Sequence, residues 1–597
     1  MMLSTLRISR LHLYKYLFKH KYVNLSTGAS DQNEKLLRGL EDDSNLKSHY
    51  DCIVIGAGHN GLIAATYLQR AGLNVCVLEK RHVIGGAAVT EEIIPGFKFS
   101  RASYVLSLLR PQIIEDLELM KYGLKLYFRD PHSYTPVIMS EGGKTKHMSL
   151  SLGRDVKQNV QQIAQFSNKD AVAYIDYEKQ LQLFVDAIEP LLDVNPVHIP
   201  TWTQHGILKR KVNNWPSVKA LLKTAKTLHQ NIPEFYQMLT APAVTVLNKW
   251  FESEPLKATL ATDSVIGAMT SPQLVGSGYV LLHHVMGNLE GTKGEWAYVE
   301  GGMGALSEAI AQAARHAGVD IFVNKPVNKI LVQNTNRVKG VVTCDGQAIS
   351  AELILSNATP HITFLELLHK NELPEEFVRD MSHIDYTSPV TKINVAVKSI
   401  PNFLASPNKK GQRSQPHHQA TIHLNCENMS LIHDAYLDAQ KGIYSQKPVI
   451  EMTIPSSLDP TLAPPNHHVV QLFTQYTPYT LADGQEWTDE LKNKYAKLVF
   501  ENIEDYAPGF LESIIGVDIL TPPDLEREFS LTGGNIFHGS MSLHQLYSHR
   551  PLPAYCDTRS PIYGLYLCGS GAHPGGGVMG SPGKLAAITA LHDQKKK

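Results

Sequence analysis

The alternation of apolar and polar residues predicts a strand, a turn, a helix and a second strand shortly after residue 50. Residues 52–55 are a short apolar run of the kind that forms a buried parallel strand. Residues 56–61 read GAGHNG, and the segment after them carries apolar residues at helical spacing: Leu62, Ala65 and Leu68. A second apolar run, 74–78, ends at Glu79. This order predicts the start of a parallel α/β sheet.

The three glycines between the first strand and the helix have the spacing of a dinucleotide-binding turn. Gly56 lets the chain turn tightly, Gly58 has no side chain to hold a pyrophosphate off the backbone amides, and Gly61 lets the helix pack close to the strand. Glu79 can accept hydrogen bonds from a ribose diol and would repel a 2′-phosphate. We therefore predict nucleotide binding, although this motif does not distinguish NAD from FAD.

The patterning of the remaining chain predicts a helical region followed by a region with strands. Residues 155–290 are mostly helical in pattern, and Ser253-Glu254-Pro255 is typical of a helix start. Residues 363–530 mix helical segments with apolar runs that predict strands at 392–398, 449–454 and 469–474.

Composition and charge exclude several classes of protein. The chain has 597 residues, 43% of them apolar, and a formal charge of −1, which predicts a large soluble globular protein with two domains. A nucleic-acid partner would require a basic stripe that this composition does not provide. No segment qualifies as a transmembrane helix. The 27 histidines include adjacent pairs, which should point apart on a helix or strand, and we predict no metal site.

The cysteines do not support dithiol chemistry. Six are present, and the closest two, Cys556 and Cys568, are twelve positions apart, whereas dithiol enzymes usually place two thiols in Cys-x-x-Cys. Cys568 ends a predicted buried strand, so we interpret it as a packed thiol. A second nucleotide fingerprint for NAD(P)H is also missing, because Gly276-Ser277-Gly278 lacks the third glycine.

The first thirty residues have the pattern of a mitochondrial presequence. They contain five basic residues, no acid, and interleaved leucine, isoleucine, tyrosine and phenylalanine. A disordered basic leader is the alternative. Unpaired cysteines fit a reducing compartment. We predict mitochondrial localisation, in the matrix.

Three further segments resemble flavin enzymes of the phytoene desaturase and amine oxidase group. The first continues the glycine motif with Lys80-Arg81 and Gly85-Gly86. The second, 298–306, reads YVEGGMGAL and leads to IFVNKPVNKI at 321–330, and the third, 564–583, is a strand with a glycine-rich continuation. The resemblance runs from about residue 50 to the C-terminus, with the segments in the group's order.

The resemblance implies a fold and a set of segments. The fold is α/β, with a Rossmann-type FAD-binding domain of the GR2-like kind, an intertwined α+β substrate domain and a helical cap. The expected segments are a leader (1–30), a linker (31–48), FAD-binding parts (49–150, 291–362 and 531–597), a helical cap over the substrate (151–290) and a substrate domain (363–530). We expect the cap to be an ordinary packed one without membrane contact.

The resemblance also implies one FAD, which we predict is held without a covalent bond. Val327 would clamp the adenine end through its backbone. The complete set of predicted cofactor-binding residues is Ile55, Gly56, Ala57, Gly58, His59, Asn60, Gly61, Glu79, Lys80, Arg81, Gly85, Gly86, Ala87, Arg101, Val327, Gly569, Ser570, Gly576, Gly577 and Val578. For Arg101, a role as an ordinary surface arginine is an equal alternative.

The implied reaction is the oxidation of an apolar or amphipathic small molecule. His573 and His538 are the candidate acid/base residues, because the group's pattern places both near the flavin ring, and hydrogen bonding to backbone or cofactor is the competing interpretation. The expected electron acceptor is oxygen or a quinone-type molecule. Mitochondrial proteins, including inner-membrane or respiratory-chain components, are candidate partners.

Two alternatives remain open from the sequence. An amine oxidase would need an aromatic pair facing the flavin and a lysine near its N5 atom, and the sequence does not place these. A flavoprotein without turnover that acts on mitochondrial partners is the other alternative. The substrate is not specified by the sequence.

Overall fold

The computed structural model describes residues 45–198, 202–203, 206–207, 214–334 and 336–595. The described elements belong to one unit, residues 41–597. The predicted leader (1–30) and most of the predicted linker (31–48) lie outside the described residues.

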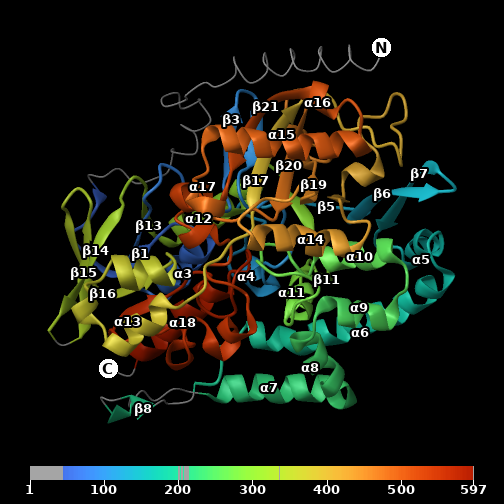
Figure 1. Cartoon of the computed structure of the whole chain (residues 1–597). Helices are drawn as coiled ribbons and strands as arrows, with labels where there is room; N and C mark the ends of the chain where they lie inside the picture. Colours follow the sequence, from blue (N-terminus) through green and yellow to red (C-terminus); the bar gives the residue numbers. More distant parts are fainter. Residues whose placement is uncertain (1–44, 199–201, 204–205, 208–213, 335, 596–597) are drawn as a thin grey trace. The chain divides into compact units, whose positions relative to one another are not determined.

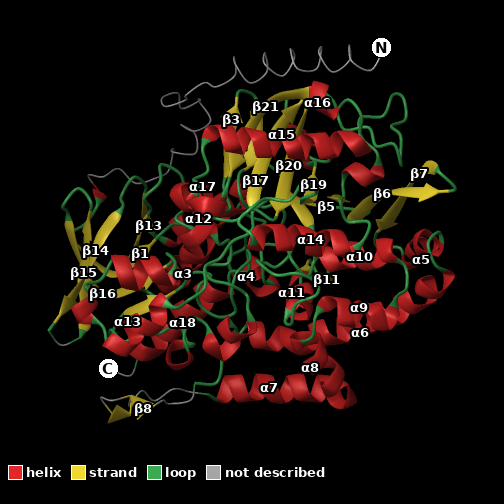
Figure 2. Ribbon diagram, viewed as in Figure 1, coloured by secondary structure: helices red, strands yellow, loops and turns green. Residues whose placement is uncertain are grey.

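Among these residues, a seven-stranded sheet carries the glycine motif (Figures 1 and 2). Its order is β13 (Asp320–Phe322), β2 (Val75–Leu78), β1 (His49–Ile55), β16 (Ala348–Ser356), β15 (Arg337–Thr343) and β14 (Val327–Gln333), and β22 (Leu565–Leu567) also pairs with β16. The strands β13, β2, β1, β16 and β22 are parallel, whereas β15 and β14 are antiparallel. The sheet thus collects strands from three distant parts of the chain.

The parallel strands are buried because helices pack against them. β1 reads HYDCIVI, and its last four residues are almost inaccessible to solvent. The helix α3 (His59–Arg70) contacts both α12 (Met303–Ala317) and α18 (Ser581–Gln594), while α13 (Glu375–Ser382) adds Phe377 against Phe364. Apolar strands of this kind need such cover, since backbone pairing alone leaves their side chains exposed.

The carboxyl ends of four parallel strands meet at one edge of this sheet. β15 pairs with the first half of β16 (Gly340↔Ser350), and β22 pairs with the second half (Ile354↔Leu565). The loops that follow β1, β2, β16 and β22 therefore emerge side by side. In parallel sheets this edge is where ligands bind.

A second seven-stranded sheet lies in the upper part of Figure 1. Its order is β21 (Ile514–Leu520), β17 (Thr391–Val397), β20 (His468–Gln475), β19 (Val449–Thr453), β18 (Thr421–Leu424), β6 (Ser133–Glu141) and β7 (Lys144–Leu152), with only the β18–β6 pair parallel. The helix α15 (Asp489–Tyr506) covers one face with an apolar cluster that includes Ile393 and Leu472. The other helices of this region are α14 (Met429–Gln440), α16 (Phe510–Ser513) and α17 (Pro522–Phe529).

The segment that follows β7 in the sequence forms a helical cap. It consists of α5 (Val156–Ala164), α6 (Asn168–Leu192), α7 (Trp215–Leu228), α8 (Ile232–Thr240), α9 (Ala243–Trp250), α10 (Glu254–Thr262) and α11 (Ser277–His284). The smaller elements are α4 (Pro111–Asp116) and the strand pairs β3 (Thr90–Ile94) with β4 (Phe97–Ser100), β5 (Leu126–Phe128) with β12 (Ala297–Val299), β8 (Trp202–Thr203) with β9 (Gly206–Ile207), and β10 (Asn288–Leu289) with β11 (Thr292–Lys293).

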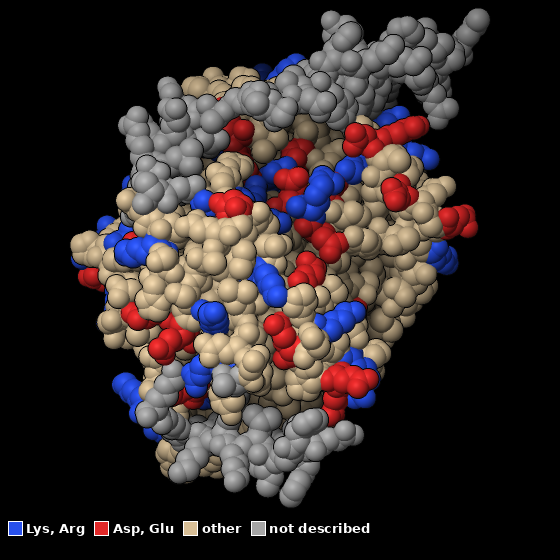
Figure 3. Space-filling model, turned by 90° about the vertical axis from the view of Figure 1, so that its left-hand side faces the viewer, with Lys and Arg blue, Asp and Glu red and all other residues tan. Residues whose placement is uncertain are grey.

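The surface seen in Figure 3 carries acidic and basic side chains mixed together, and both signs gather around a hollow in its upper half. In the part of the chain that the structure describes, no helix is long and apolar enough to cross a bilayer.

The predicted fold class is confirmed, and so are the predicted strands at 392–398, 449–454 and 469–474, each within a residue or two. The helix start at Ser253 is confirmed, with α10 beginning at Glu254. One segment boundary differs: β6 and all but the last two residues of β7 fall in the range 49–150, yet both strands pair in the second sheet. Local alternation predicts a strand but does not say which sheet it joins.

Candidate functional site

A cavity of about 720 Å³ joins the glycine loops of the first sheet to the second sheet and the cap. Its wall includes Gly56 and Gly58 after β1, Glu79 after β2, Lys392 on β17 and Tyr177 on α6. This volume is within the range of cofactor and substrate sites. The predicted nucleotide loop and the predicted substrate domain therefore border the same space.

The loop after β1 depends on the absence of side chains at its glycines. Gly56 has φ +94°, a conformation that residues with a Cβ rarely adopt. A Cβ on Gly61 would lie 2.2 Å from the carbonyl oxygen of Gly56, so α3 can start this close to β1 only with glycine there. Gly58 is the N-cap of α3, and its backbone is extended.

Asn357, the first residue after β16, was missed by the sequence analysis. Its side chain lies between the glycine loops, because a Cβ on Gly58 would be 2.6 Å from its Nδ2 and one on Gly61 would be 3.2 Å from its Cβ. Its backbone also contacts the loop after β22, where a Cβ on Gly569 would be 2.7 Å from the Asn357 oxygen. Asn357 therefore spaces the β1 and β22 loops, and it also lines the cavity.

Glu79, the residue predicted to bind the ribose, is fixed in place at the end of β2. Glu79 accepts hydrogen bonds from the backbone amides of Ala57 (2.8 Å) and Arg81 (2.9 Å). Burial raises the pKa of its carboxyl, and these two amides oppose that rise. Each carboxylate oxygen retains a lone pair for a further donor, which is what recognition of a diol requires.

The chemistry of this wall fits the nucleotide part of a flavin cofactor. Three buried polar atoms in it have no hydrogen-bond partner among the described residues: His59 Nε2, Asn60 Oδ1 and Arg81 Nη1. Buried polar atoms are normally paired, so these three indicate space for a polar ligand. Gly58 and Gly86 lie in the same wall and have no side chain, so a ligand can approach their backbone closely.

The predicted cofactor residues fall into two groups. Those in the cavity wall are Ile55, Gly56, Gly58, His59, Asn60, Glu79, Lys80, Arg81, Gly85, Gly86, Ala87, Val327, Ser570, Gly577 and Val578. Those outside it are Ala57, Gly61, Arg101, Gly569 and Gly576. Of the second group, Gly576 affects the wall indirectly, because a Cβ there would lie 2.3 Å from the ring of Phe537, which lines the cavity.

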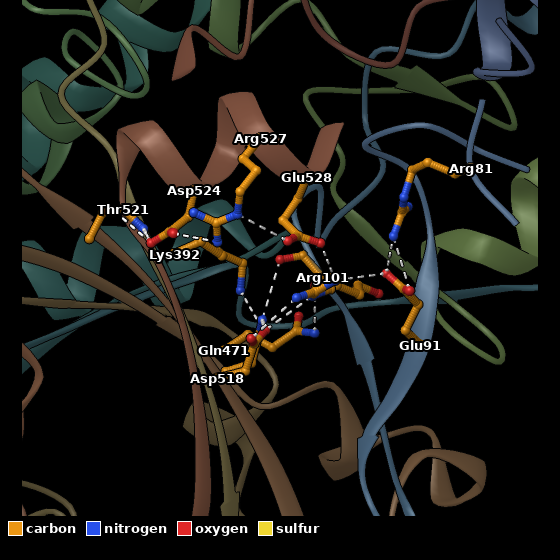
Figure 4. A network of polar contacts seen from close by, with 12 residues as sticks. Arg81, Glu91, Arg101, Lys392, Gln471, Asp518, Thr521, Asp524, Arg527 and Glu528 are labelled. Atoms are coloured by element: carbon orange, nitrogen blue, oxygen red, sulfur yellow. Dashed lines mark hydrogen bonds and ion pairs between the residues drawn. The ribbon is translucent and has the colours of Figure 1, made fainter. Parts of the chain in front are cut away.

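Arg101 lies in a network of ion pairs that ties the two sheets together (Figure 4). Its guanidinium contacts Glu91 on β3 (3.4 Å), Asp518 on β21 (3.3 Å) and Glu528 on α17 (3.1 Å). Glu91 also pairs with Arg81 at 2.9 Å. These carboxylates raise the pKa of Arg101 and occupy its donors. The contacts are those of a structural arginine. Two members of the network in Figure 4 also line the cavity, Arg81 and Lys392. Lys392 donates to Asn394 at 2.9 Å, and the Asn394 amide donates to Asp518 at 3.1 Å.

The two candidate acid/base histidines occupy different places. His538 lines the cavity, its Nδ1 has no partner among the described residues, and burial lowers its pKa to about 3. His573 lies outside the cavity wall, and its Nε2 is 2.8 Å from the Leu191 carbonyl oxygen. Burial lowers the pKa of His573 to about 4. Both rings are therefore neutral near pH 7, and of the two only His538 faces the cavity.

Arg550 fixes the loop that carries His538. Its guanidinium donates to the carbonyl oxygens of Phe537, Gly539 and Ser540, and also to that of Ser570 at 2.9 Å. Because Ser570 lies in the β22 loop, this one buried side chain joins two walls of the cavity. Burial lowers the pKa of Arg550 to about 10.

A row of four side chains crosses the cavity face of the second sheet. The pairing register sets Lys392 opposite Phe473, Phe473 opposite Glu451, and Glu451 opposite His423. All four line the cavity, whereas their sequence neighbours Ile393, Ile450 and Leu472 point to the α15 side. Adjacent strands therefore place a lysine, an aromatic ring, a carboxyl and an imidazole in line.

Two of the three titratable groups of this row have pKa values near neutral pH, whereas burial lowers the pKa of the third, His423, to about 3. Burial raises the pKa of Glu451 to about 7 and lowers that of Lys392 to about 7. The Tyr104 hydroxyl donates to Glu451 at 2.8 Å, and the Lys392 ammonium lies 5.2 Å from the centre of the Tyr104 ring. Groups with such pKa values can take up and release protons at low cost.

Two further carboxyls enter the cavity from the cap. Burial raises the pKa of Asp263 to about 8, with repulsion from Glu451 and Glu178 adding to the effect. Burial also raises the pKa of Glu178. Within the described residues, no lysine or arginine forms an ion pair with any of the three.

The structure corrects one argument about histidines. Two of the adjacent pairs do not point apart: the ring centres of His417 and His418 are 4.1 Å apart, and those of His283 and His284 are 5.1 Å apart. His417 and His418 lie on a short 3-10 helix, where neighbouring side chains do not alternate between opposite faces as they do in a strand. Among the described residues, no group of three or more potential ligands could hold a metal ion.

Comparison with known proteins agrees with this geometry. Residues 61–429 match the family described as flavin containing amine oxidoreductase. The chain is 60% identical to the pyridine nucleotide-disulfide oxidoreductase domain-containing protein 2 of Rattus norvegicus, over 92% of this chain and 94% of that protein. It is 25% identical to a lycopene-forming phytoene desaturase of Pseudescherichia vulneris, over 90% and 98%.

A solved structure shares the fold. It is a triple mutant of putrescine oxidase with a TM-score of 0.55 and 15% identity, covering 92% of this chain and 99% of that one. A family whose model covers more than half of the chain implies a flavin cofactor here. The chain belongs to the flavin containing amine oxidoreductase family, is related to desaturases, and is an oxidoreductase by that membership.

Proposed function

We propose that the chain is an FAD-dependent oxidoreductase of the mitochondrial matrix that oxidises an amphipathic small molecule. The observation that carries this proposal is the single cavity that borders both the dinucleotide loops and the row on the second sheet. FAD is favoured over a smaller flavin because Glu79 and Val327, at the expected adenosine end, also line the cavity. Localisation rests on the basic, acid-free leader, residues 1–30.

The cofactor is held without a covalent bond in this proposal. None of the described cysteines is among the residues that line the cavity, and Cys568 is fully buried with a raised pKa. A thiol with these properties is a poor nucleophile. The nucleotide would be held by the backbone of the β1 loop, by Glu79 and by the guanidinium of Arg81.

Bound FAD would supply a two-electron acceptor for the substrate carbon. The residues of the chain supply positioning and proton transfer. Tyr177, Leu181 and Val185 on α6 give the cavity an apolar side, while Glu451 and Lys392 give it a polar one. A molecule with an apolar body and a polar group would fit both sides, and Glu451 would accept its proton while Tyr104 holds the carboxylate in place. Oxygen or a quinone-type molecule would then accept the electrons.

The test has two steps. Acid precipitation of the purified protein should release FAD into the supernatant, and flavin that stays in the pellet would contradict non-covalent binding. The holoprotein is then mixed anaerobically with a broad metabolite library, and flavin bleaching is recorded. A protein that binds FAD but is reduced by no substrate would support the alternative of a flavoprotein without turnover.

An amine oxidase is the second candidate function, and the three cavity carboxyls favour it. Glu178, Asp263 and Glu451 lie in a cavity with no ion-pair partner from lysine or arginine among the described residues, so an ammonium group would supply the missing charge. Lys392, which lines the cavity from the second sheet, is our candidate for the lysine that an amine oxidase needs near the flavin N5 atom.

The pH dependence of binding distinguishes this candidate. An ammonium ion binds the ionised carboxyls, whose pKa values are raised to about 7 for Glu451 and about 8 for Asp263. Binding of an amine should therefore strengthen as the pH rises through these values, and Asp263→Asn should weaken it. Flavin reduction by neutral substrates with no response to amines would reject this candidate.

A further inference from the structure

The outer face of α7 in the cap combines basic and apolar side chains. The helix, Trp215–Leu228, contains lysines at 219, 223 and 226, all exposed, and no acid. The sequence carries no aspartate or glutamate between Asp193 and Glu234. The whole chain has a formal charge of −1, so this basic stretch is a local feature.

The geometry of α7 sets these side chains apart from its buried face. Ser217, Ala220, Thr224 and Leu228 are the buried residues, and Thr224 donates a hydrogen bond to the Ala187 carbonyl of α6 at 2.6 Å. At about 100° per residue, the opposite face of the helix carries four residues: Trp215, Lys219, Leu222 and Lys226. Trp215 is 68% exposed and Leu222 is 63% exposed.

The next helix extends the same kind of surface. On α8, Tyr236 is 67% exposed and Ile232 is 49% exposed. An apolar groove of about 500 Å³ lies between α7 and the end of α6, with Pro190 and Val194 on one side and Lys219, Lys223 and Lys226 on the other. Large apolar side chains exposed together, with lysines beside them, mark an interaction surface.

We propose that this surface, formed by the outer faces of α7 and α8, docks the protein on an anionic phospholipid bilayer. The three lysines attract negative lipid headgroups, and each should contribute about 1 kcal/mol to the free energy of membrane binding. Tryptophan and tyrosine side chains prefer the boundary between headgroups and acyl chains, where Trp215 and Tyr236 would lie. Leu222 and Ile232 would enter the apolar layer. The protein lies on the membrane and does not cross it.

Docking would place the cap, and not the sheets, against the membrane. α6 separates α7 from the cavity: Ala187 accepts the bond from α7, whereas Leu181 and Val185 line the cavity. The cavity is then one helix away from the bilayer. This inference does not depend on the proposed reaction, because it rests on surface residues that do not line the cavity.

The test is co-sedimentation of the full-length holoprotein with vesicles. Vesicles of phosphatidylcholine alone are compared with vesicles that also contain phosphatidylserine. Lys219→Glu, Lys223→Glu and Lys226→Glu together should weaken binding to the anionic vesicles by about a hundredfold or more. Trp215→Ala with Leu222→Ala should weaken it by about tenfold or more.

A matched control carries the same charge change elsewhere. Lys398→Glu, Lys409→Glu and Lys410→Glu alter three exposed lysines in the second-sheet region. The control should keep wild-type binding, flavin content should be unchanged in all variants, and added salt should weaken wild-type binding.

Four outcomes would overturn the proposal. They are no binding to anionic vesicles, equal binding to neutral ones, equal loss in the control, and dimerisation through this surface. Dimerisation would appear in light scattering as a lipid-independent dimer that Trp215→Ala with Leu222→Ala dissociates, and it would identify a second copy of the chain as the occupant.

Discussion

Replacing Gly58 by alanine should destabilise the protein through Asn357. The added Cβ would lie 2.6 Å from Asn357 Nδ2, well inside ordinary van der Waals contact, while its next neighbours are at 3.8 and 4.0 Å. Asn357 is confined by Gly61 on one side and by Gly569 on the other. An overpacked contact of this kind costs about 1–3 kcal/mol. For a chain of this length, that is a fall of about 1–3 °C in the unfolding midpoint.

A double variant tests whether Asn357 is the cause. Asn357→Ala removes both Nδ2 and Cγ, so the remaining contact of the new Cβ is with the Gly85 oxygen at 4.0 Å. The effects of Gly58→Ala and Asn357→Ala should therefore be less than additive, with a coupling energy close to the 1–3 kcal/mol penalty. Gly61→Ala is the matched control: its Cβ would meet the Gly56 carbonyl at 2.2 Å, and Asn357→Ala leaves that contact in place.

Thermal unfolding of the flavin-free proteins measures stability, and FAD content is measured separately. In the double variant we expect stability to recover while FAD retention stays low, because the Cβ still stands in the loop that lines the cavity. Gly58→Val should retain no FAD. Strictly additive effects would refute the assigned role of Asn357, and wild-type FAD content in Gly58→Val would show that the loop does not bind the nucleotide.

Four other predictions follow from the site. Arg101→Met leaves Glu91, Asp518 and Glu528 without their shared cation and should lower the free energy of unfolding by about 3 kcal/mol, measured by urea unfolding. Glu451 has a native pKa of about 7, above its unfolded value of 4.5, so the native state binds the extra proton and wild-type stability falls as the pH rises between these values. Glu451→Gln should remove that fall, up to about 3 kcal/mol at pH 8, and parallel pH profiles would contradict the assignment. NADH and NADPH should reduce the flavin slowly or not at all in stopped-flow absorbance, because the sequence has no second nucleotide fingerprint. Thiol reagents should leave activity largely unchanged, because the sequence has no closely spaced cysteine pair. Rapid, saturable bleaching of the flavin by NADH or NADPH would instead indicate a reductase. Deleting residues 2–30 should abolish mitochondrial import and preserve FAD binding in the purified protein. Normal mitochondrial localisation of the truncated protein by microscopy would contradict the targeting role of residues 1–30.

The nucleotide loop was predictable from the sequence because its signal is local. The apolar run of β1, the three glycines and Glu79 occupy one short stretch, and each residue has a role that neighbours along the chain define. Asn357 gives no such signal. It acts on glycines about 300 positions earlier and about 200 later, and it reaches them only because β16 pairs with β1 on one side and with β22 on the other. A single asparagine after an apolar run is otherwise an ordinary strand end.

The row on the second sheet could not be predicted for a related reason. Lys392, Glu451 and Phe473 sit in strands that the pattern locates correctly, whereas the strand of His423, β18, was not predicted. A shift of one residue in pairing would turn Glu451 to the α15 side and leave Lys392 opposite an aliphatic residue. The register is fixed by the apolar residues between them: Ile393, Ile450 and Leu472 must all face α15. Packing of the apolar face against α15 therefore decides which side chains of the sheet line the cavity on the other face. The same apolar cluster that stabilises this domain aligns lysine, aromatic ring, carboxyl and imidazole along the cavity, so substitutions that shift these strands should alter the raised pKa of Glu451 before they unfold the protein.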